Sequence, residues 1–200
     1  MALKDYEIKK VKVDDAKALK IDTVLWNMGD GAPDTYTQIS YDDEGFNIKF
    51  TIKESEPLAL QTKHCEHVHT DSCVEFFVNF MPEETNWYIN FEVNANGIMN
   101  PAYRQDRYQF KHLSIDEINS FGIKTDIKEN YWTVSFKVSY EFVKSYYKDF
   151  DINNCDYIIG NLQKCCESTD ETYFLSYFPI ECEKPDFHRP EYFGKFTVVH

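Results

Sequence analysis

Hydrophobic and polar residues alternate along two neighbouring runs of the chain, at 71–80 (DSCVEFFVNF) and 87–94 (WYINFEVN). Successive side chains of a strand point to opposite faces of a sheet. One face of these two strands is therefore predicted to be apolar, with Val74, Phe76, Val78, Phe80, Trp87, Ile89, Phe91 and Val93. The opposite face carries Glu75, Phe77, Asn79, Tyr88, Asn90, Glu92 and Asn94. Carboxyl, amide and phenol groups on one sheet face are typical of a surface that binds a polar ligand with many hydroxyl groups.

The same period of two recurs along most of the chain and indicates strands rather than helices. Residues 36–41 and 46–52 form one predicted hairpin, and 122–128 and 131–139 form another. Further strands are predicted at 6–13, 157–163, 173–178 and 193–199, and short helices at 115–120 and 140–147. The pattern therefore predicts an all-β fold, an antiparallel β-sandwich of about ten strands with one or two short helices.

Three predicted connections, at 54–70, 101–114 and 179–190, are too long for simple hairpin turns. Long loops on a rigid sheet are where binding groups concentrate. The chain has no internal repeat and no linker-like segment, so residues 1–200 are interpreted as a single domain.

The balance of 21 basic and 34 acidic residues gives a net charge of −13, which disfavours nucleic acid and anionic membrane surfaces as partners. The chain has no apolar run of the ~20 residues that a membrane span needs, and residues 1–10 are too polar for a secretory signal. At face value the protein is cytoplasmic, unless a leader has been removed. Acidic pairs such as Asp14-Asp15, Asp42-Asp43 and Glu83-Glu84 are interpreted as solvated turns, with a structural Ca²⁺ site as the alternative.

Several groups could carry chemistry of other kinds. If the segment 64–69 is extended, Cys65, His67 and His69 share one face, as a Zn²⁺ site would require. Cys165 or Cys166 with His188 and Asp186 is the nearest candidate for a nucleophilic site. Glu75 and Glu92 form a possible pair of catalytic carboxyls of the glycosidase type. None of these groups has the spacing of an established motif.

The segment 185–190 (PDFHRP) holds an aromatic ring, an imidazole and a guanidinium between two prolines that stiffen it. Phe187 could stack on a flat ligand face while Arg189 donates two hydrogen bonds to adjacent oxygens. In the alternative interpretation, Phe187 caps the core and Arg189 pairs with a surface acid.

Four runs in this order, DSCVEFFVNF, NFEVNANG (90–97), GNLQKC (160–165) and PDFHRPEYFG (185–194), resemble the carbohydrate-binding family 9-like proteins. The resemblance covers roughly residues 20–200. It implies a β-sandwich without catalytic machinery that binds sugar and often holds structural Ca²⁺. Relatives attached to xylanases clamp a terminal sugar between two tryptophans, and polar residues of the sheet contact its hydroxyl groups.

Matching the motifs residue by residue places the two clamp positions at His69 and Phe187. It keeps two polar contacts, Glu75 and Asn94, and puts Glu92 where the family has an arginine. The expected sugar contacts are His69, Glu75, Glu92, Asn94, Asn161, Phe187, His188 and Arg189.

The leading hypothesis is a non-catalytic protein that binds a mono- or oligosaccharide and requires no cofactor. One alternative is a glycan-active enzyme, or an accessory domain of one, that uses Glu75 and Glu92. Another is a haem- or metal-binding sandwich module. The oligomeric state is left open.

Overall fold

A computed structural model describes residues 6–167 and 172–200; residues 1–5 and 168–171, which the predicted domain 1–200 includes, lie outside the described part. Its strands are β1 (Tyr6–Lys9), β2 (Leu19–Ile21), β3 (Thr23–Val24), β4 (Thr35–Tyr41), β5 (Gly45–Ile52), β6 (Cys73–Asn79), β7 (Tyr88–Asn94), β8 (Ala102–Arg104), β9 (Phe110–His112), β10 (Lys124–Ile127), β11 (Trp132–Ser139), β12 (Tyr157–Cys166), β13 (Tyr173–Ser176) and β14 (Gly194–Val199). Its α-helices are α1 (Ile115–Ser120) and α2 (Tyr140–Tyr146). Short 3₁₀ helices lie at Val13–Asp15, Val68–Thr70, Ile152–Asn154 and Pro190–Tyr192.

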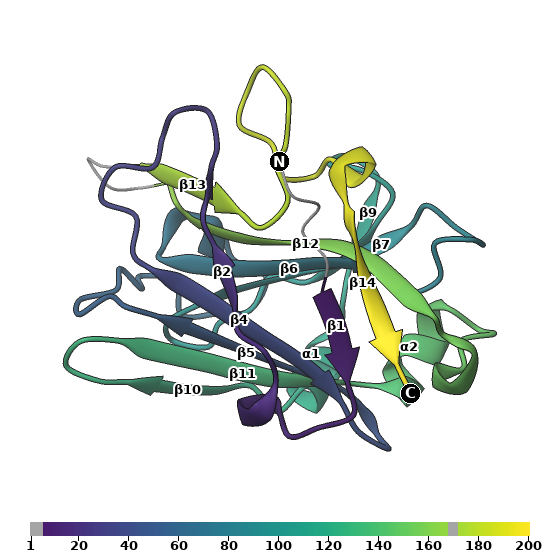
Figure 1. Ribbon diagram of the computed structural model, residues 1–200. Helices are drawn as coiled ribbons and strands as arrows, with labels where there is room; N and C mark the ends of the chain where they lie inside the picture. Colours follow the sequence, from purple (N-terminus) through teal and green to yellow (C-terminus); the bar gives the residue numbers. More distant parts are fainter. Residues whose placement is uncertain (1–5, 168–171) are drawn as a thin grey trace.

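The described strands form one 14-stranded sheet with the main order β10-β11-β5-β4-β1-β14-β12-β6-β7-β8-β9. The sheet curls over, so that the layer containing β12, β6 and β7 lies above the layer containing β4, β5, β11 and β10 (Figure 1). The predicted all-β sandwich is therefore confirmed. One difference is that β1 pairs in parallel with β14 and with β4. A period of two identifies a strand but leaves the direction of its partner open, so the sequence pattern did not reveal this.

The main core lies between the two layers and contains the alternating apolar residues of β5, β6, β7 and β11. Phe76 and Phe91 are almost fully buried there, and the Phe91 ring lies 5.5 Å from the Phe136 ring of the opposite layer. Burying a side chain of this size stabilises the fold by roughly 1.5–3 kcal/mol. The strand register predicted from the alternation is confirmed on this face.

Local hydrogen bonds explain where the hairpin and the helices begin. In the turn between β4 and β5, Asp42 Oδ1 accepts from the backbone N–H groups of Glu44 and Gly45. Ser114 and Glu117 form a capping box at the start of α1. Both predicted helices are present, and α2 ends one residue earlier than expected. Within the described ranges, no helix has the length and apolar character needed to cross a bilayer.

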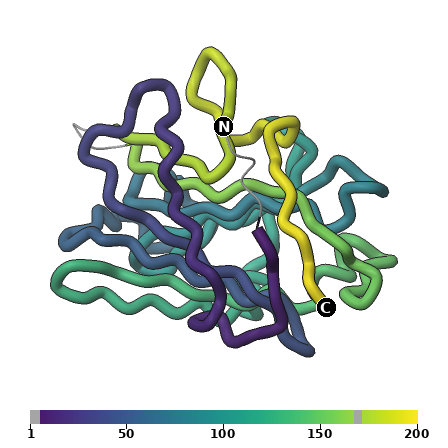
Figure 2. Tube along the Cα trace, in the orientation of Figure 1, coloured from purple at the N-terminus to yellow at the C-terminus, as the bar shows by residue number. Residues whose placement is uncertain are grey.

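The other face of β6, β7 and β12 is also covered. A second apolar cluster lies on it, made of Leu25, Val68, Cys73, Phe77, Tyr88, Cys165, Phe174, Ile180 and Phe187. Figure 2 shows the segment around residues 180–188, in yellow-green, rising above this layer close to the purple segment that follows β3. The Trp26 indole joins the two segments by donating to the Cys182 carbonyl at 2.9 Å. Because β12 is covered on both faces, Cys165 and Cys166 are both buried, although adjacent residues of a strand point to opposite sides.

Candidate functional site

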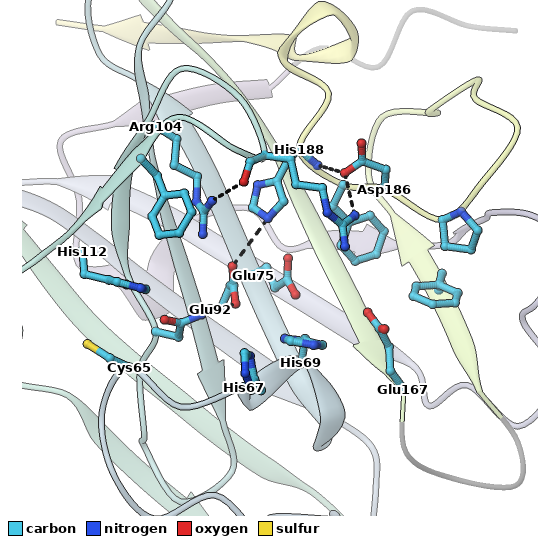
Figure 3. Close-up of a pocket in the computed structure, with 16 residues that line it drawn as sticks. Cys65, His67, His69, Glu75, Glu92, Arg104, His112, Glu167, Asp186 and His188 are labelled. Carbon is cyan, nitrogen blue, oxygen red and sulfur yellow. Dashed lines mark hydrogen bonds and ion pairs between the residues drawn. The ribbon is translucent and has the colours of Figure 1, made fainter.

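A cavity of about 300 Å³ opens over the polar face of β6 and β7 (Figure 3). Its walls come from the three long connections at 54–70, 101–114 and 179–190, together with β6, β7 and residues near β13. The lining residues are Cys65, His67, His69, Glu75, Glu92, Asn100, Arg104, Arg107, Phe110, His112, Glu167, Phe174, Pro185, Asp186, Phe187 and His188. The strand scaffold thus brings three segments that are distant in sequence to one concave surface. The segment at 101–114, which was predicted to be a connection, contains the paired strands β8 and β9.

Two carboxyl groups form the floor of this pocket. Glu75 on β6 and Glu92 on β7 lie directly opposite each other in the antiparallel register, and both are almost completely buried. Glu92 is held by two amides, since the side chains of Asn90 and Asn100 donate to its two carboxylate oxygens at 2.8 and 3.0 Å. The Cys165 thiol lies 3.3 Å from Glu75 Oε1.

Burial changes the protonation of both carboxyls. It raises the pKa of Glu75 well above its ordinary value, and the neighbouring Cys165 and Glu92 add to this shift. Burial also raises the pKa of Glu92 to about 7, although Arg104 opposes the shift. The buried site therefore favours the protonated form of Glu75, and Glu92 is close to half protonated near neutral pH. Such carboxyls can donate as well as accept hydrogen bonds, which suits ligands whose hydroxyl groups do both.

His188 covers the floor from the loop side. Its ring stacks on Phe77 at 4.8 Å between centroids, and its Nδ1 lies 3.1 Å from the Tyr88 hydroxyl. Its Nε2 lies 4.0 Å from Glu92 Oε1, which is too long for a direct hydrogen bond. Burial, with repulsion from Arg104 among further causes, lowers the pKa of His188 well below its ordinary value. The imidazole is therefore neutral, and the contact with Glu92 is not an ion pair near neutral pH.

Two arginines from the 101–114 segment also reach the pocket, and sequence analysis assigned neither of them. Arg104 Nε donates to Asn90 Oδ1 at 2.5 Å, while its guanidinium carbon lies 4.2 Å from the centre of the Phe110 ring. Arg107 Nη1 donates to Asp186 Oδ1 at 3.2 Å. The sequence signal that could have identified Arg104 and Arg107 is the interleaving of arginines and aromatic residues in a segment that was predicted to be too long for a turn. Although Glu92 stands where the family arginine was expected, Arg104 lies beside the same strand.

Three phenylalanines line the pocket, and two of them, Phe110 and Phe187, differ in exposure. Phe187 is only 8% exposed and packs against Trp26 and Phe174, at 5.9 and 5.8 Å between ring centroids. Phe110 is 44% exposed, and Arg104 lies over its ring. Phe110 therefore offers more accessible aromatic surface than Phe187 does.

Five of the residues predicted to contact a ligand line the pocket together: His69, Glu75, Glu92, Phe187 and His188. Figure 3 shows the two carboxyls between the histidines of the 54–70 segment and His188. Burial lowers the pKa of His69, so this ring too tends to be neutral.

The other three predicted residues, Asn94, Asn161 and Arg189, do not line the pocket. Asn94 lies on the expected face, but it donates to Asp71 Oδ2 and to the Gln61 carbonyl. Asn161 also faces this side, where it donates to the Phe178 carbonyl and accepts from the Phe178 N–H. Both amides satisfy backbone or buried polar groups that the covering segments bring onto the sheet. Arg189 forms an ion pair with Glu191 outside the pocket.

The proposed zinc segment does not have the expected extended geometry. Cys65 has a positive φ of 65°, and a 3₁₀ helix begins at Val68. His67 and His69 lie with their ring centroids 5.4 Å apart, but they do not form a close group of metal-ligating atoms with Cys65 in the part of the chain that the structure describes. Because the segment turns, the three side chains do not share one strand face, as the zinc hypothesis required.

The nucleophile hypothesis also lacks the required geometry. The Cys165 thiol contacts the Glu75 carboxyl and the His69 carbonyl, while the His188 ring is directed to Tyr88 and Glu92. A hydrogen bond with Cys73 and burial both raise the pKa of Cys165. A nucleophilic cysteine needs the opposite shift, because the thiolate is the reactive form.

The acidic turns are occupied by local partners. Asp14 bonds Lys49 and Asp43 bonds Lys10, while Asp42 accepts from backbone amides of its own turn. Among the described residues, the close group of three metal-ligating side chains is Cys73, Glu75 and Cys165, which offers a single carboxyl. This donor set does not suit Ca²⁺, which prefers six to eight oxygen ligands. A structural calcium ion elsewhere stays a prediction.

Comparison with known protein families decides which class of protein this is. The profile of carbohydrate-binding family 9 matches residues 7–198. The chain belongs to this family. Domains of family 9 are non-catalytic binding modules. A search of curated protein sequences gives no match to this family 9 chain.

Solved structures with the same fold extend over nearly the whole chain. A candidate carbohydrate-binding protein from Bacteroides uniformis is 22% identical, with a TM-score of 0.82 over 98% of this chain and 99% of that chain. A family 9 module from Caldicellulosiruptor kristjanssonii in complex with cellotriose is 11% identical, with a TM-score of 0.68 over 98% and 93%. The glucose complex of a family 9 module from that organism is 10% identical, with a TM-score of 0.69 over 98% and 96%. At these identities the similarity establishes the fold.

Proposed function

We propose that this family 9 chain is a non-catalytic module that binds a mono- or oligosaccharide in the pocket over β6 and β7. The observation that carries the proposal is that four polar side chains converge on one cavity of about 300 Å³. They are Glu75, Glu92, Arg104 and His188. A pocket of this size accommodates a small ligand, and a few convergent polar groups are what orient such a ligand. The glucose and cellotriose complexes of other family 9 modules support the same ligand class.

The chemistry of the lining groups favours a neutral, hydroxyl-rich ligand. Arg104 and Arg107 supply donors, the amide-bound Glu92 supplies acceptors, and the raised pKa values of the carboxyls limit the negative charge on the floor. Phe110 and Phe187 offer apolar ring surface on which the C–H face of a sugar can pack. Arg107 is paired with Asp186, and Arg104 lies near the partly ionised Glu92, so neither a strongly anionic nor a strongly cationic ligand is favoured.

The catalytic alternative assigns Glu75 and Glu92 as acid and base. Glu92 is fixed by Asn90 and Asn100, and Glu75 meets the Cys165 thiol, so both carboxyls have protein partners. We expect them to position the sugar, and hydrolysis of a chromogenic glycoside that disappears in Glu75→Gln would establish the enzyme instead. A haem module would show itself by a strong visible absorption band in the purified protein.

The direct test is calorimetric titration and thermal shift with glucose, cellotriose and a wider panel of mono- and oligosaccharides. At a ligand concentration of 100 times Kd, binding adds about 2.7 kcal/mol to the free energy of unfolding. Arg104→Met should weaken binding by roughly 10- to 150-fold, because a charge-assisted hydrogen bond contributes about 1.5–3 kcal/mol. The matched control is Arg189→Met, an arginine outside the pocket, which should bind as the parent does.

The proposal fails if no sugar of the panel binds or shifts the melting temperature. It fails equally if Arg104→Met and Arg189→Met bind a sugar with the affinity of the parent, because the ligand then occupies another surface.

A further inference from the structure

Three potential metal ligands meet at the floor of the pocket. Cys73 on β6 and Cys165 on β12 lie directly opposite each other in the antiparallel register, and Glu75 follows Cys73 on the same face of β6. One ligand atom from each of the three residues lies within 4.8 Å of the other two. All three side chains are buried, and the structure contains both cysteines as free thiols.

The spacing of these atoms matches tetrahedral coordination. The distances from Glu75 Oε1 to the sulfur atoms are 3.3 Å for Cys165 and 3.9 Å for Cys73. Zinc binds thiolate sulfur at about 2.3 Å and carboxylate oxygen at about 2.0–2.2 Å, so a tetrahedral angle separates the two ligand atoms by roughly 3.5 Å. The two observed distances lie on either side of this value. Only small side-chain movements would be needed to enclose an ion.

The carboxyl of Glu75 has no strong donor in the described part of the chain. The hydrogen bonds that reach it come from the two thiols, which are weak donors. Lys164 does not compensate for its charge, because Lys164 Nζ donates to Ser72 Oγ and Tyr173 OH on the other face of β12. A buried carboxyl with such partners needs either a proton or a cation.

The pocket provides a route for an ion. Glu75 lines the pocket, whereas Cys73 and Cys165 do not, so an ion would reach the sulfur atoms through the Glu75 carboxyl that both thiols contact. Three protein ligands leave one tetrahedral position for a water molecule. The soft sulfur pair selects a thiophilic ion and disfavours Ca²⁺ or Mg²⁺.

From this arrangement we propose that Cys73, Glu75 and Cys165 form a binding site for a thiophilic divalent cation of the Zn²⁺ class at the floor of the pocket. Binding forms two metal–sulfur bonds and one metal–oxygen bond, and the two thiol protons are released to solvent with any proton on Glu75. Affinity therefore rises with pH, because the ligands must lose their protons. This proposal does not depend on sugar binding.

The test uses the full chain, purified with a reductant and freed of metal by a chelator. Co²⁺ is the probe, because a tetrahedral thiolate complex gives both sulfur-to-metal charge-transfer and intense visible bands, which Zn²⁺ then removes by competition. We expect one Co²⁺ per chain. Native mass spectrometry should show one bound Zn²⁺ with loss of at least two protons.

Cysteine variants test where the metal ion binds. Cys73→Ser and Cys165→Ser should each lower the Co²⁺ affinity at least tenfold and remove the charge-transfer band, while Cys182→Ser, a cysteine outside the group, should keep both. Far-UV circular dichroism checks that each variant is folded. If Cys73→Ser unfolds, Glu75→Gln supplies the second test, with weaker binding but the sulfur band retained.

The parent failing to bind Co²⁺ with its thiols reduced would overturn the proposal. So would a charge-transfer band that survives in both Cys73→Ser and Cys165→Ser, or one that disappears in Cys65→Ser instead. A variant that loses sugar binding does not affect this test, because the test measures only the spectrum of the bound metal.

Discussion

The two faces of β6 and β7 are both buried, but one face packs in the apolar core and the other lies under the pocket. Phe76 on the core face is 1% exposed, and its sequence neighbour Glu75 on the pocket face is 2% exposed. On the core face, Phe76 and Phe91 stack with each other, and Phe91 packs against the Phe136 ring of the opposite layer. On the pocket face, Glu75 and Glu92 lie among amides, thiols and an imidazole. Burial alone therefore does not distinguish a core from a binding site.

The energetic consequences of the two faces are opposite. The core face stabilises the fold because it removes apolar surface from water. The pocket face carries a cost, and the raised pKa values of Glu75 and Glu92 show that the buried site disfavours the charged carboxylate. Such costs are typical of functional sites, where polar groups are kept in place for a ligand.

The largest expected effect belongs to the core face. Phe76→Ala should lower the free energy of unfolding by about 3–5 kcal/mol, because it removes a buried ring and leaves a cavity between the layers. Sugar affinity of the folded protein should stay near that of the parent. Denaturant titration measures the first quantity and calorimetry the second. Tyr131→Ala, at an exposed position, is the control and should change stability by less than about 0.5 kcal/mol.

The carboxyl of Glu92 should make stability depend on pH. Its pKa of about 7 in the native state lies above the ordinary value of 4.5. Its stabilising contribution is therefore fully present below about pH 4.5 and is lost as the pH rises to 7. At about 1.4 kcal/mol per pH unit the loss reaches a few kcal/mol. Urea titrations across this range should show a flatter profile in Glu92→Gln than in the parent or in Glu129→Gln, an exposed control. An unchanged slope would mean that Glu92 ionises like a solvated carboxyl.

Asn161 shares the pocket face but has a structural environment. Asn161→Ala removes an amide that satisfies the N–H and the carbonyl of Phe178, so about 1–3 kcal/mol of stability should be lost. Affinity for sugar should not change. Asn119→Ala on α1, where the side chain is exposed, serves as the comparison in the same melting experiment. If the Asn161→Ala variant melts like the parent but binds sugar more weakly, Asn161 contacts the sugar and its role is not structural.

The smallest expected effect belongs to the pocket rim. Phe110→Ala should weaken sugar binding by about 1 kcal/mol, or roughly fivefold, through loss of an aromatic contact surface. Its stability should change little, because the ring is 44% exposed. Phe187→Ala is the matched comparison, and it should mainly lower the melting temperature because its ring packs on Trp26 and Phe174. The opposite result, with affinity lost only in Phe187→Ala, would identify Phe187 as the stacking residue.

The local sequence pattern by itself determined the longer strands, both short helices and the assignment of Phe76 and Glu75 to opposite faces, but it did not predict the short strands β2, β3, β8 and β9. These features depend on the period of two and on local caps, which are properties of neighbouring residues. The motifs around Glu75 and Phe187 were also sufficient to indicate the family, because a family profile is a property of sequence.

Only the tertiary structure decided which polar residues meet. Asn94 and Asn161 lie on the predicted face, but groups of the covering segments use their hydrogen bonds. Arg104 enters the pocket from β8, a strand that the alternation did not predict. The parallel pairing of β1 and the opposition of Cys73 and Cys165 were equally hidden. The physical reason is that contacts between residues distant in sequence depend on how the sheet curls and on which loops cover it, and no local periodicity encodes either.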